Sequence, residues 1–223
     1  MHSKFRYTIL MQGGVSKWTS EIVNEYLIRF PDARILLSTW TTENVDKINC
    51  EIIQLEQPEI PKPHKSTVNH QIIGASEGLK KIDEGIIMKC RTDQFIHNSK
   101  IFEIYEKECP KEKIMIPNQG TYETLDYRVS DFCQIGTKKI LEDYWSNIPL
   151  HNGKLQIESG QYMTKNYILK IRNDDGPWKL VLRKYFLVKD VHDVFQMEWE
   201  KLNEFEDYQG VYKRNFPVSA KND

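Results

Sequence analysis

The sequence lacks any long hydrophobic stretch, and no apolar run approaches the roughly 18 residues that a membrane-spanning helix needs. Residues 1–7 contain no signal-peptide apolar segment. A basic excess is also missing, because 31 Lys and Arg face 32 Asp and Glu, for a formal net charge of −1. We therefore expect a cytoplasmic protein that has no transmembrane segment and binds no nucleic acid.

Several sequence motifs are absent as well. The four cysteines include no C-x-x-C pair, which argues against a disulfide framework, and no two of the six histidines have the four-residue spacing of a zinc-binding helix. No G-x-G-x-x-G, P-loop or G-x-S-x-G motif occurs. These absences exclude the familiar dinucleotide, P-loop and serine-hydrolase sites.

What the sequence does contain is an alternation of short apolar runs with amphipathic stretches, with a repeat of about 30 residues, typical of βαβ units. This pattern predicts an α/β fold with a mostly parallel sheet flanked by helices. Strands are expected at residues 7–11, 33–38, 51–55, 85–90 and 114–116, and helices at 19–30, 68–82 and 101–109. Beyond residue 126 we expect strands at 127–130 and 181–188 and helices at 136–145 and 158–170.

Two polar segments directly follow predicted strands. Residues 12–14 (QGG) follow the first strand and residues 91–93 (RTD) the fourth. Parallel sheets bind ligands at the carboxyl ends of their strands, so both segments are candidate binding elements. Asp93 is suited to a divalent cation or a ribose hydroxyl, and Arg91 to phosphate. The alternatives are a plain glycine turn and a strand-end salt bridge of Arg91 with an acid.

These segments belong to a longer series of motifs. Together the series resembles the WavE-like lipopolysaccharide-synthesis proteins over residues 7–190. The matching elements are Q-G at 12–13, F-P-D-A-R-I-L-L-S-T-W at 30–40, Asn69 and Gln71 ahead of G-L at 78–79, K-C-R-T-D at 89–93, S-D-F-C-Q-I-G at 130–136, Glu158 ahead of Tyr162, and K-Y-F at 184–186.

The resemblance implies a single domain of the GT-A glycosyltransferase type over residues 1–223. Its nucleotide-sugar-binding half would be residues 1–126, and its acceptor half, with the C-terminal tail, residues 127–223. Such an enzyme would move a sugar from a UDP- or GDP-sugar to a growing surface polysaccharide or lipopolysaccharide, a carbohydrate or glycolipid acceptor. Peripheral attachment to the inner face of the membrane is left open. The donor-binding residues implied are Gln12, Gly13, Thr39, Asn69, Gln71, Arg91 and Asp93.

The predicted cofactor is Mn²⁺ or Mg²⁺ held by Asp93. Most metal-dependent GT-A enzymes carry two acids spaced D-x-D at this place, and this sequence has Asp93 alone. Arg91 could instead neutralise the diphosphate through charge-assisted hydrogen bonds, without a metal.

The predicted catalytic residues are two acids in the second half. Inverting transfer needs a carboxylate within reach of the acceptor hydroxyl. We expect Glu158 to act as the base and Asp131 to orient a sugar, although each could simply compensate a helix dipole. Two other functions stay open: a sugar nucleotidyltransferase, which would show a glycine- and lysine-rich first loop, and a non-catalytic nucleotide-sugar-binding module.

Overall fold

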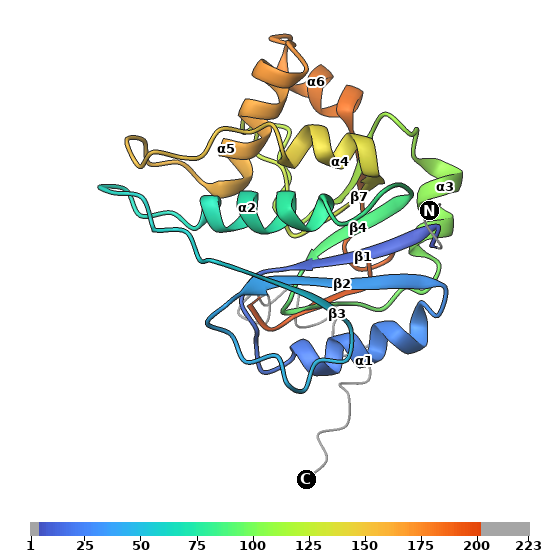
Figure 1. Cartoon of the computed structure of the whole chain (residues 1–223). Helices are drawn as coiled ribbons and strands as arrows, with labels where there is room; N and C mark the ends of the chain where they lie inside the picture. Colours follow the sequence, from blue (N-terminus) through green and yellow to red (C-terminus); the bar gives the residue numbers. More distant parts are fainter. Residues whose placement is uncertain (1–4, 202–223) are drawn as a thin grey trace.

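A seven-stranded sheet runs through the centre of the computed structural model, which describes residues 5–201 (Figure 1). Its strand order is β3-β2-β1-β4-β7-β6-β8, and only β7 runs antiparallel to its neighbours. The strands are β1 (Tyr7–Gln12), β2 (Ala33–Trp40), β3 (Glu51–Leu55), β4 (Ile86–Arg91), β6 (Ile114–Pro117), β7 (Cys133–Thr137) and β8 (Phe186–Lys189), while β5 (Gln94–Ile96) and β9 (Met197–Trp199) pair separately. The predicted α/β fold with a mostly parallel sheet is confirmed.

Helices cover both faces of this sheet, and each face has its own buried apolar cluster. Successive side chains of a strand point to opposite faces, so on β1 Ile9 and Met11 enter one cluster and Leu10 the other. One face is covered by α1 (Thr19–Arg29) and α3 (Ile101–Glu108), the other by α2 (Val68–Leu79), α4 (Lys138–Trp145), α5 (Ser159–Asn166), the π-helical turn η1 (Tyr167–Ile171) and α6 (Trp178–Tyr185). Within residues 5–201, no helix combines the length and apolarity needed to cross a bilayer.

The structure corrects three of the predicted elements. The strand expected at 181–188 is mostly α6, because its buried residues Trp178, Val181, Leu182 and Tyr185 have helical spacing. Residues 127–130 form no strand, and Tyr127 adopts a φ of 60°. The helix expected from residue 136 begins at 138, because residues 133–137 first complete β7 beside β4.

Helix α2 lies unusually close to β1 because two of its residues have no side chain. A Cβ at Gly74 would be 2.7 Å from Cγ of Gln12, and one at Gly78 would be 2.5 Å from Cδ1 of Leu10. The Ser38 hydroxyl on β2 donates a 2.7 Å hydrogen bond to the Gly74 carbonyl. This contact fixes the start of α2 at the carboxyl edge of the sheet.

His97 joins α1 to the two-stranded sheet. Its side chain is buried; Nδ1 contacts the Glu25 carboxylate on α1, and Nε2 lies 2.8 Å from Oε2 of Glu198 on β9. Arg29, also on α1, donates to the His97 carbonyl at 3.0 Å. Burial by itself lowers the pKa of His97, but the two carboxylates outweigh it and raise the pKa overall. When it is protonated, His97 therefore links β9 to α1 through both carboxylates.

We predict that this contact makes the free energy of unfolding fall as pH rises above about 6.5, because the pKa of His97 is raised in the folded protein. A histidine whose pKa is raised by folding stabilises the folded state. This contribution is fully present below the pKa of the unfolded state, about 6.5, and is lost as pH rises through the pKa of the folded state. The free energy of unfolding of wild type should exceed that of His97→Gln most at pH 6, and the difference should shrink by pH 9 in urea titrations. The exposed His64→Gln is the control. A difference that grows with pH would contradict this account.

Candidate functional site

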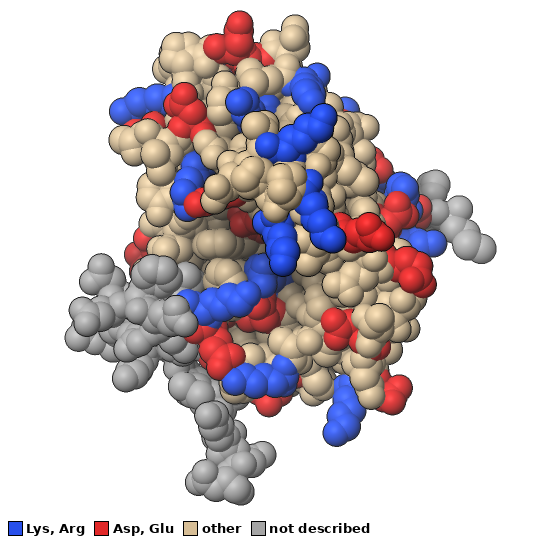
Figure 2. All heavy atoms as spheres, turned by 90° about the vertical axis from the view of Figure 1, so that its left-hand side faces the viewer, with Lys and Arg blue, Asp and Glu red and all other residues tan. Residues whose placement is uncertain are grey.

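The two polar segments singled out in the sequence meet at the carboxyl edge of the sheet. Gln12 at the end of β1 pairs with Arg91 at the end of β4. Gly13 adopts a φ of 136°, which side chains rarely tolerate, and the Thr92 hydroxyl donates to the Gly14 carbonyl at 2.5 Å. The turn after β1 is thus fastened to the end of β4. This edge lies to the left in Figure 1 and faces the viewer in Figure 2.

Arg91 and Asp93 form a two-pronged ion pair at this edge. Nε and Nη2 of Arg91 donate to the two Asp93 carboxylate oxygens at 2.9 and 3.1 Å. Burial raises the pKa of Asp93, but the bonds and charge of Arg91 outweigh it and lower the pKa overall. The guanidinium lies 4.9 Å from the Trp199 ring centroid, and Nζ of Lys201 lies 3.9 Å from Asp93. Two cations around one acid leave a net positive charge, suited to a phosphate.

A divalent cation does not fit these residues well. Within residues 5–201, no three His, Cys, Asp or Glu side chains come together as a metal-binding group. Both oxygens of Asp93 already accept from Arg91, and the charges of Arg91 and Lys201 would repel a second cation. The Mn²⁺ or Mg²⁺ at Asp93 stays a prediction that this donor set does not support.

The other predicted donor-binding side chains are partly engaged within the fold. Nε2 of Gln12 donates to the His70 carbonyl at 3.2 Å, beneath α2. Thr39 is fully buried, and its hydroxyl has no hydrogen-bond partner among the described residues. Gln71 is half-buried near the start of α2. Among the predicted donor-binding residues, Gly13 and Arg91 are therefore best placed to contact a ligand at this edge.

Asn69 has a structural partner that the sequence did not reveal. Its Nδ2 donates to the His151 carbonyl at 3.0 Å, while its Oδ1 accepts from the His151 backbone N–H at 2.7 Å. Both residues are buried. The side-chain amide thus ties the loop between α4 and α5 to the first turn of α2.

The two predicted catalytic acids lie near each other, around the start of α5. Asp131 lies two residues before β7, whose first residue, Cys133, pairs with Cys90 near the end of β4. A Cβ added to Gly160 in the first turn of α5 would be 3.9 Å from the Asp131 carboxyl carbon. Glu158 precedes α5 and forms a 2.6 Å ion pair with Arg128. The backbone of Asp131 therefore lies near the end of β4, and Glu158 lies at the start of α5.

Lys89 is a charged residue of this region that the motif reading passed over. It is fully buried; its Nζ donates to the Asp131 carbonyl at 3.2 Å and lies 4.3 Å from the Trp145 ring centroid. Burial lowers the pKa of Lys89 to about 8, although the Asp131 carboxylate partly opposes that shift. The sequence signal for this residue was the presence of a lysine inside the otherwise apolar run of β4.

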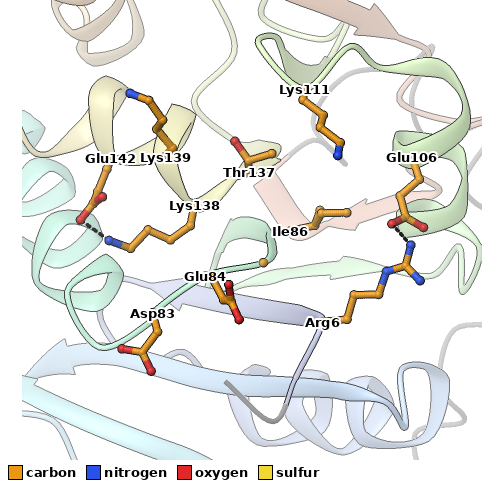
Figure 3. A pocket seen from close by; sticks show the side chains of 11 residues that line it. Arg6, Asp83, Glu84, Ile86, Glu106, Lys111, Thr137, Lys138, Lys139 and Glu142 are labelled. Carbon is orange, nitrogen blue, oxygen red and sulfur yellow. Dashed lines mark hydrogen bonds and ion pairs between the residues drawn. The ribbon is translucent and has the colours of Figure 1, made fainter. Parts of the chain in front are cut away.

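A separate cavity of about 540 Å³ opens at the opposite edge of the sheet, where β1 and β4 begin (Figure 3). Its charged side chains are mostly paired, with Arg6 against Glu106 and Lys138 against Glu142. It lies at the amino ends of the parallel strands, away from the segments fastened together by Thr92. We therefore place the candidate site at the carboxyl edge.

Comparison with known proteins gives one family and several similar folds. The model of the family described as WavE lipopolysaccharide synthesis matches residues 8–168. No curated protein sequence matches. A nucleotidyl transferase from Methanothermobacter is 9% identical with a TM-score of 0.50, over 76% of this chain and 85% of the other. A glycosyltransferase involved in glycosylation of the major capsid of PBCV-1 is 11% identical with a TM-score of 0.48, over 93% and 90%.

A third similar structure is S. aureus TarS in complex with UDP-GlcNAc, 13% identical with a TM-score of 0.47, over 86% of this chain and 61% of that one. At such identities structural likeness concerns the fold alone. Of these three, the nucleotidyl transferase reaches a TM-score of 0.50 and supports a shared α/β fold.

We predict that Asn69→Ala lowers the free energy of unfolding by about 1–3 kcal/mol, because it leaves the buried His151 N–H and carbonyl unsatisfied. Chemical denaturation of the variant and of the exposed control Asn147→Ala measures this cost. A structural role also predicts that nucleotide-sugar affinity changes little once the variant is folded. An unchanged stability combined with lost donor affinity would instead show that Asn69 contacts the donor.

Proposed function

This chain belongs to the WavE family of lipopolysaccharide-synthesis proteins, and we propose that it is a glycosyltransferase that moves a sugar from a UDP- or GDP-sugar to a carbohydrate or glycolipid acceptor. The observation that carries this proposal is the meeting of residues 12–14 with residues 91–93 at the carboxyl edge of the sheet. Open α/β sheets bind their ligands at that edge.

The donor diphosphate would lie against Arg91. Two of its nitrogens, Nε and Nη2, bind Asp93, which orients the guanidinium. Nη1 takes no part in that pair and would donate to phosphate oxygens. Lys201 adds a second cation nearby. The Asp93 carboxylate is in this proposal a positioning residue for Arg91, and the charge of the leaving diphosphate is balanced by side chains.

The acceptor would approach from the side of α5. We propose Asp131 as the base that takes the proton from the acceptor hydroxyl, because it lies beside the end of β4. Glu158, which the sequence favoured as base, is held by Arg128 and would orient the acceptor. Lys89 fixes the backbone carbonyl of Asp131 from below and so sets the position of this acid.

A nucleotidyltransferase is the second candidate, because the similar structure with a TM-score of 0.50 carries that description. Such an enzyme joins a nucleoside triphosphate to a sugar phosphate and releases pyrophosphate. The first loop here, residues 12–17 (QGGVSK), lacks the glycine- and lysine-rich pattern expected of it. Incubation with nucleoside triphosphates and sugar 1-phosphates, followed by a pyrophosphate assay, distinguishes the two activities.

We predict that Arg91→Ala weakens donor binding by about 10–100-fold, the cost of losing charge-assisted hydrogen bonds. Asp93→Ala, which removes the partner that orients Arg91, should weaken donor binding by a smaller factor while leaving the fold intact. Release of nucleoside diphosphate from a panel of UDP- and GDP-sugars measures turnover, and Arg183→Ala, on the distant α6, is the control.

We also predict that wild type keeps its activity after exhaustive chelation of divalent metals, because side-chain cations balance the charge of the diphosphate. Loss of all turnover on chelation would contradict charge balance by Arg91 and restore the predicted cation.

We predict that Asp131→Asn lowers turnover by about 10²–10⁴-fold, the usual contribution of a general base, while donor binding is retained. Glu158→Gln should raise the acceptor KM more than it lowers kcat. Steady-state kinetics on both variants separate the two roles. If Glu158→Gln loses turnover and Asp131→Asn does not, the assignment made from the sequence is right and the one made here is wrong.

A further inference from the structure

Two loops project together beyond the carboxyl edge of the sheet, at the left of Figure 1. One is residues 56–67, between β3 and α2, and the other residues 146–158, between α4 and α5. The His64 N–H donates to the Gly153 carbonyl at 3.1 Å, and a Cβ at Gly153 would be 2.4 Å from the Lys62 carbonyl. Asn69 fastens the second loop at its base. The fold thus holds two loop ends side by side.

The composition of these ends is unusual for this chain. We define the paired tips as residues 60–65 (IPKPHK) and 150–155 (LHNGKL), which contain no acid although the chain has 32. Their lysines, Lys62, Lys65 and Lys154, are exposed and have no ion-pair partner among the described residues. Three aliphatic side chains are exposed on the paired tips: Ile60 at 46%, Leu150 at 53% and Leu155 at 67%.

We infer that the paired tips dock on an anionic lipid surface. Aliphatic side chains that project from a fixed scaffold can enter the boundary between headgroups and acyl chains, while lysines beside them bind lipid phosphates. Figure 2 faces this end of the molecule and shows Lys and Arg side chains across its middle and upper parts, with Asp and Glu side chains among them. Two narrow projecting loops offer little area for a protein partner, which needs about 800 Å² per side. A planar membrane accommodates such a convex shape.

The position of the paired tips gives the docking a use that rests on the proposed function. A groove of about 410 Å³ begins at the first of the paired tips and extends between the loop before α2 and the start of α5. It is lined by Ile60, Lys65, Ser66, Thr67, Ile157, Glu158 and Ser159. Glu158 belongs to the acceptor side of the candidate site. Docking would hold that groove at the membrane surface, where the glycan of a lipid-anchored acceptor is found.

Binding to vesicles tests the docking without any sugar transfer. Full-length protein is sedimented with phosphatidylcholine vesicles and with vesicles that also contain phosphatidylglycerol. Wild type should bind the anionic vesicles, release at high salt, and bind the neutral ones at least tenfold more weakly. Lys62→Gln, Lys65→Gln and Lys154→Gln should each lower the partition coefficient about fivefold, the effect of roughly 1 kcal/mol per lysine. Leu150→Ser combined with Leu155→Ser should lower it more than tenfold.

Matched controls are available elsewhere on the surface. Ile28→Ser on α1 and Leu180→Ser on α6 remove side chains that are 79% and 63% exposed and should bind vesicles like wild type. A thermal-shift measurement with nucleotide-sugar should be unchanged in every tip variant, which separates docking from donor binding. The inference would be overturned if wild type did not bind anionic vesicles, or if the tip variants bound them as well as wild type.

Discussion

The close contact of α2 with β1 and β2 sets the geometry of this protein. Gly74 and Gly78 bring the helix onto Gln12 and Leu10 at distances that no side chain would allow. Because the helix runs back from the carboxyl edge, its first turn stands there, and through Asn69 it also anchors the loop that carries Leu150 and Leu155. The proposed donor edge, the proposed acceptor side and the paired tips are therefore held on one face by a single helix–sheet contact.

The order of elements in the first half could be predicted because β1, β2 and β4 are continuous apolar runs bounded by turns, as buried parallel strands are. The second half was harder. Residues 181–188 suggested one strand, although the helical spacing of Trp178, Val181, Leu182 and Tyr185 is already present in the sequence. β7 was missed because its five residues, 133–137, precede a helix without a turn and include a glycine.

The candidate site likewise has a part that the sequence predicts and a part that it does not. Strand-end position predicted that Gln12, Arg91 and Asp93 would come together, since parallel strands share an edge. Their partners come from contacts distant in sequence: Trp199 and Lys201 reach Arg91 and Asp93 through the small β5–β9 sheet. A strand-end salt bridge of Arg91 with an acid was the alternative to a binding role, and the structure identifies that acid as Asp93. We propose that this pair replaces the expected cation by a positive side-chain surface.

The central claim is that a nucleotide-sugar binds at this edge through Arg91. Thermal unfolding of wild type and Arg91→Ala with UDP-, GDP- and CMP-sugars tests it most directly, because a ligand that binds the folded state raises its midpoint. The account predicts that a UDP- or GDP-sugar raises the Tm of wild type and leaves that of Arg91→Ala almost unchanged. An equal rise in both proteins, or a rise with nucleoside triphosphates and none with any nucleotide-sugar, would contradict it.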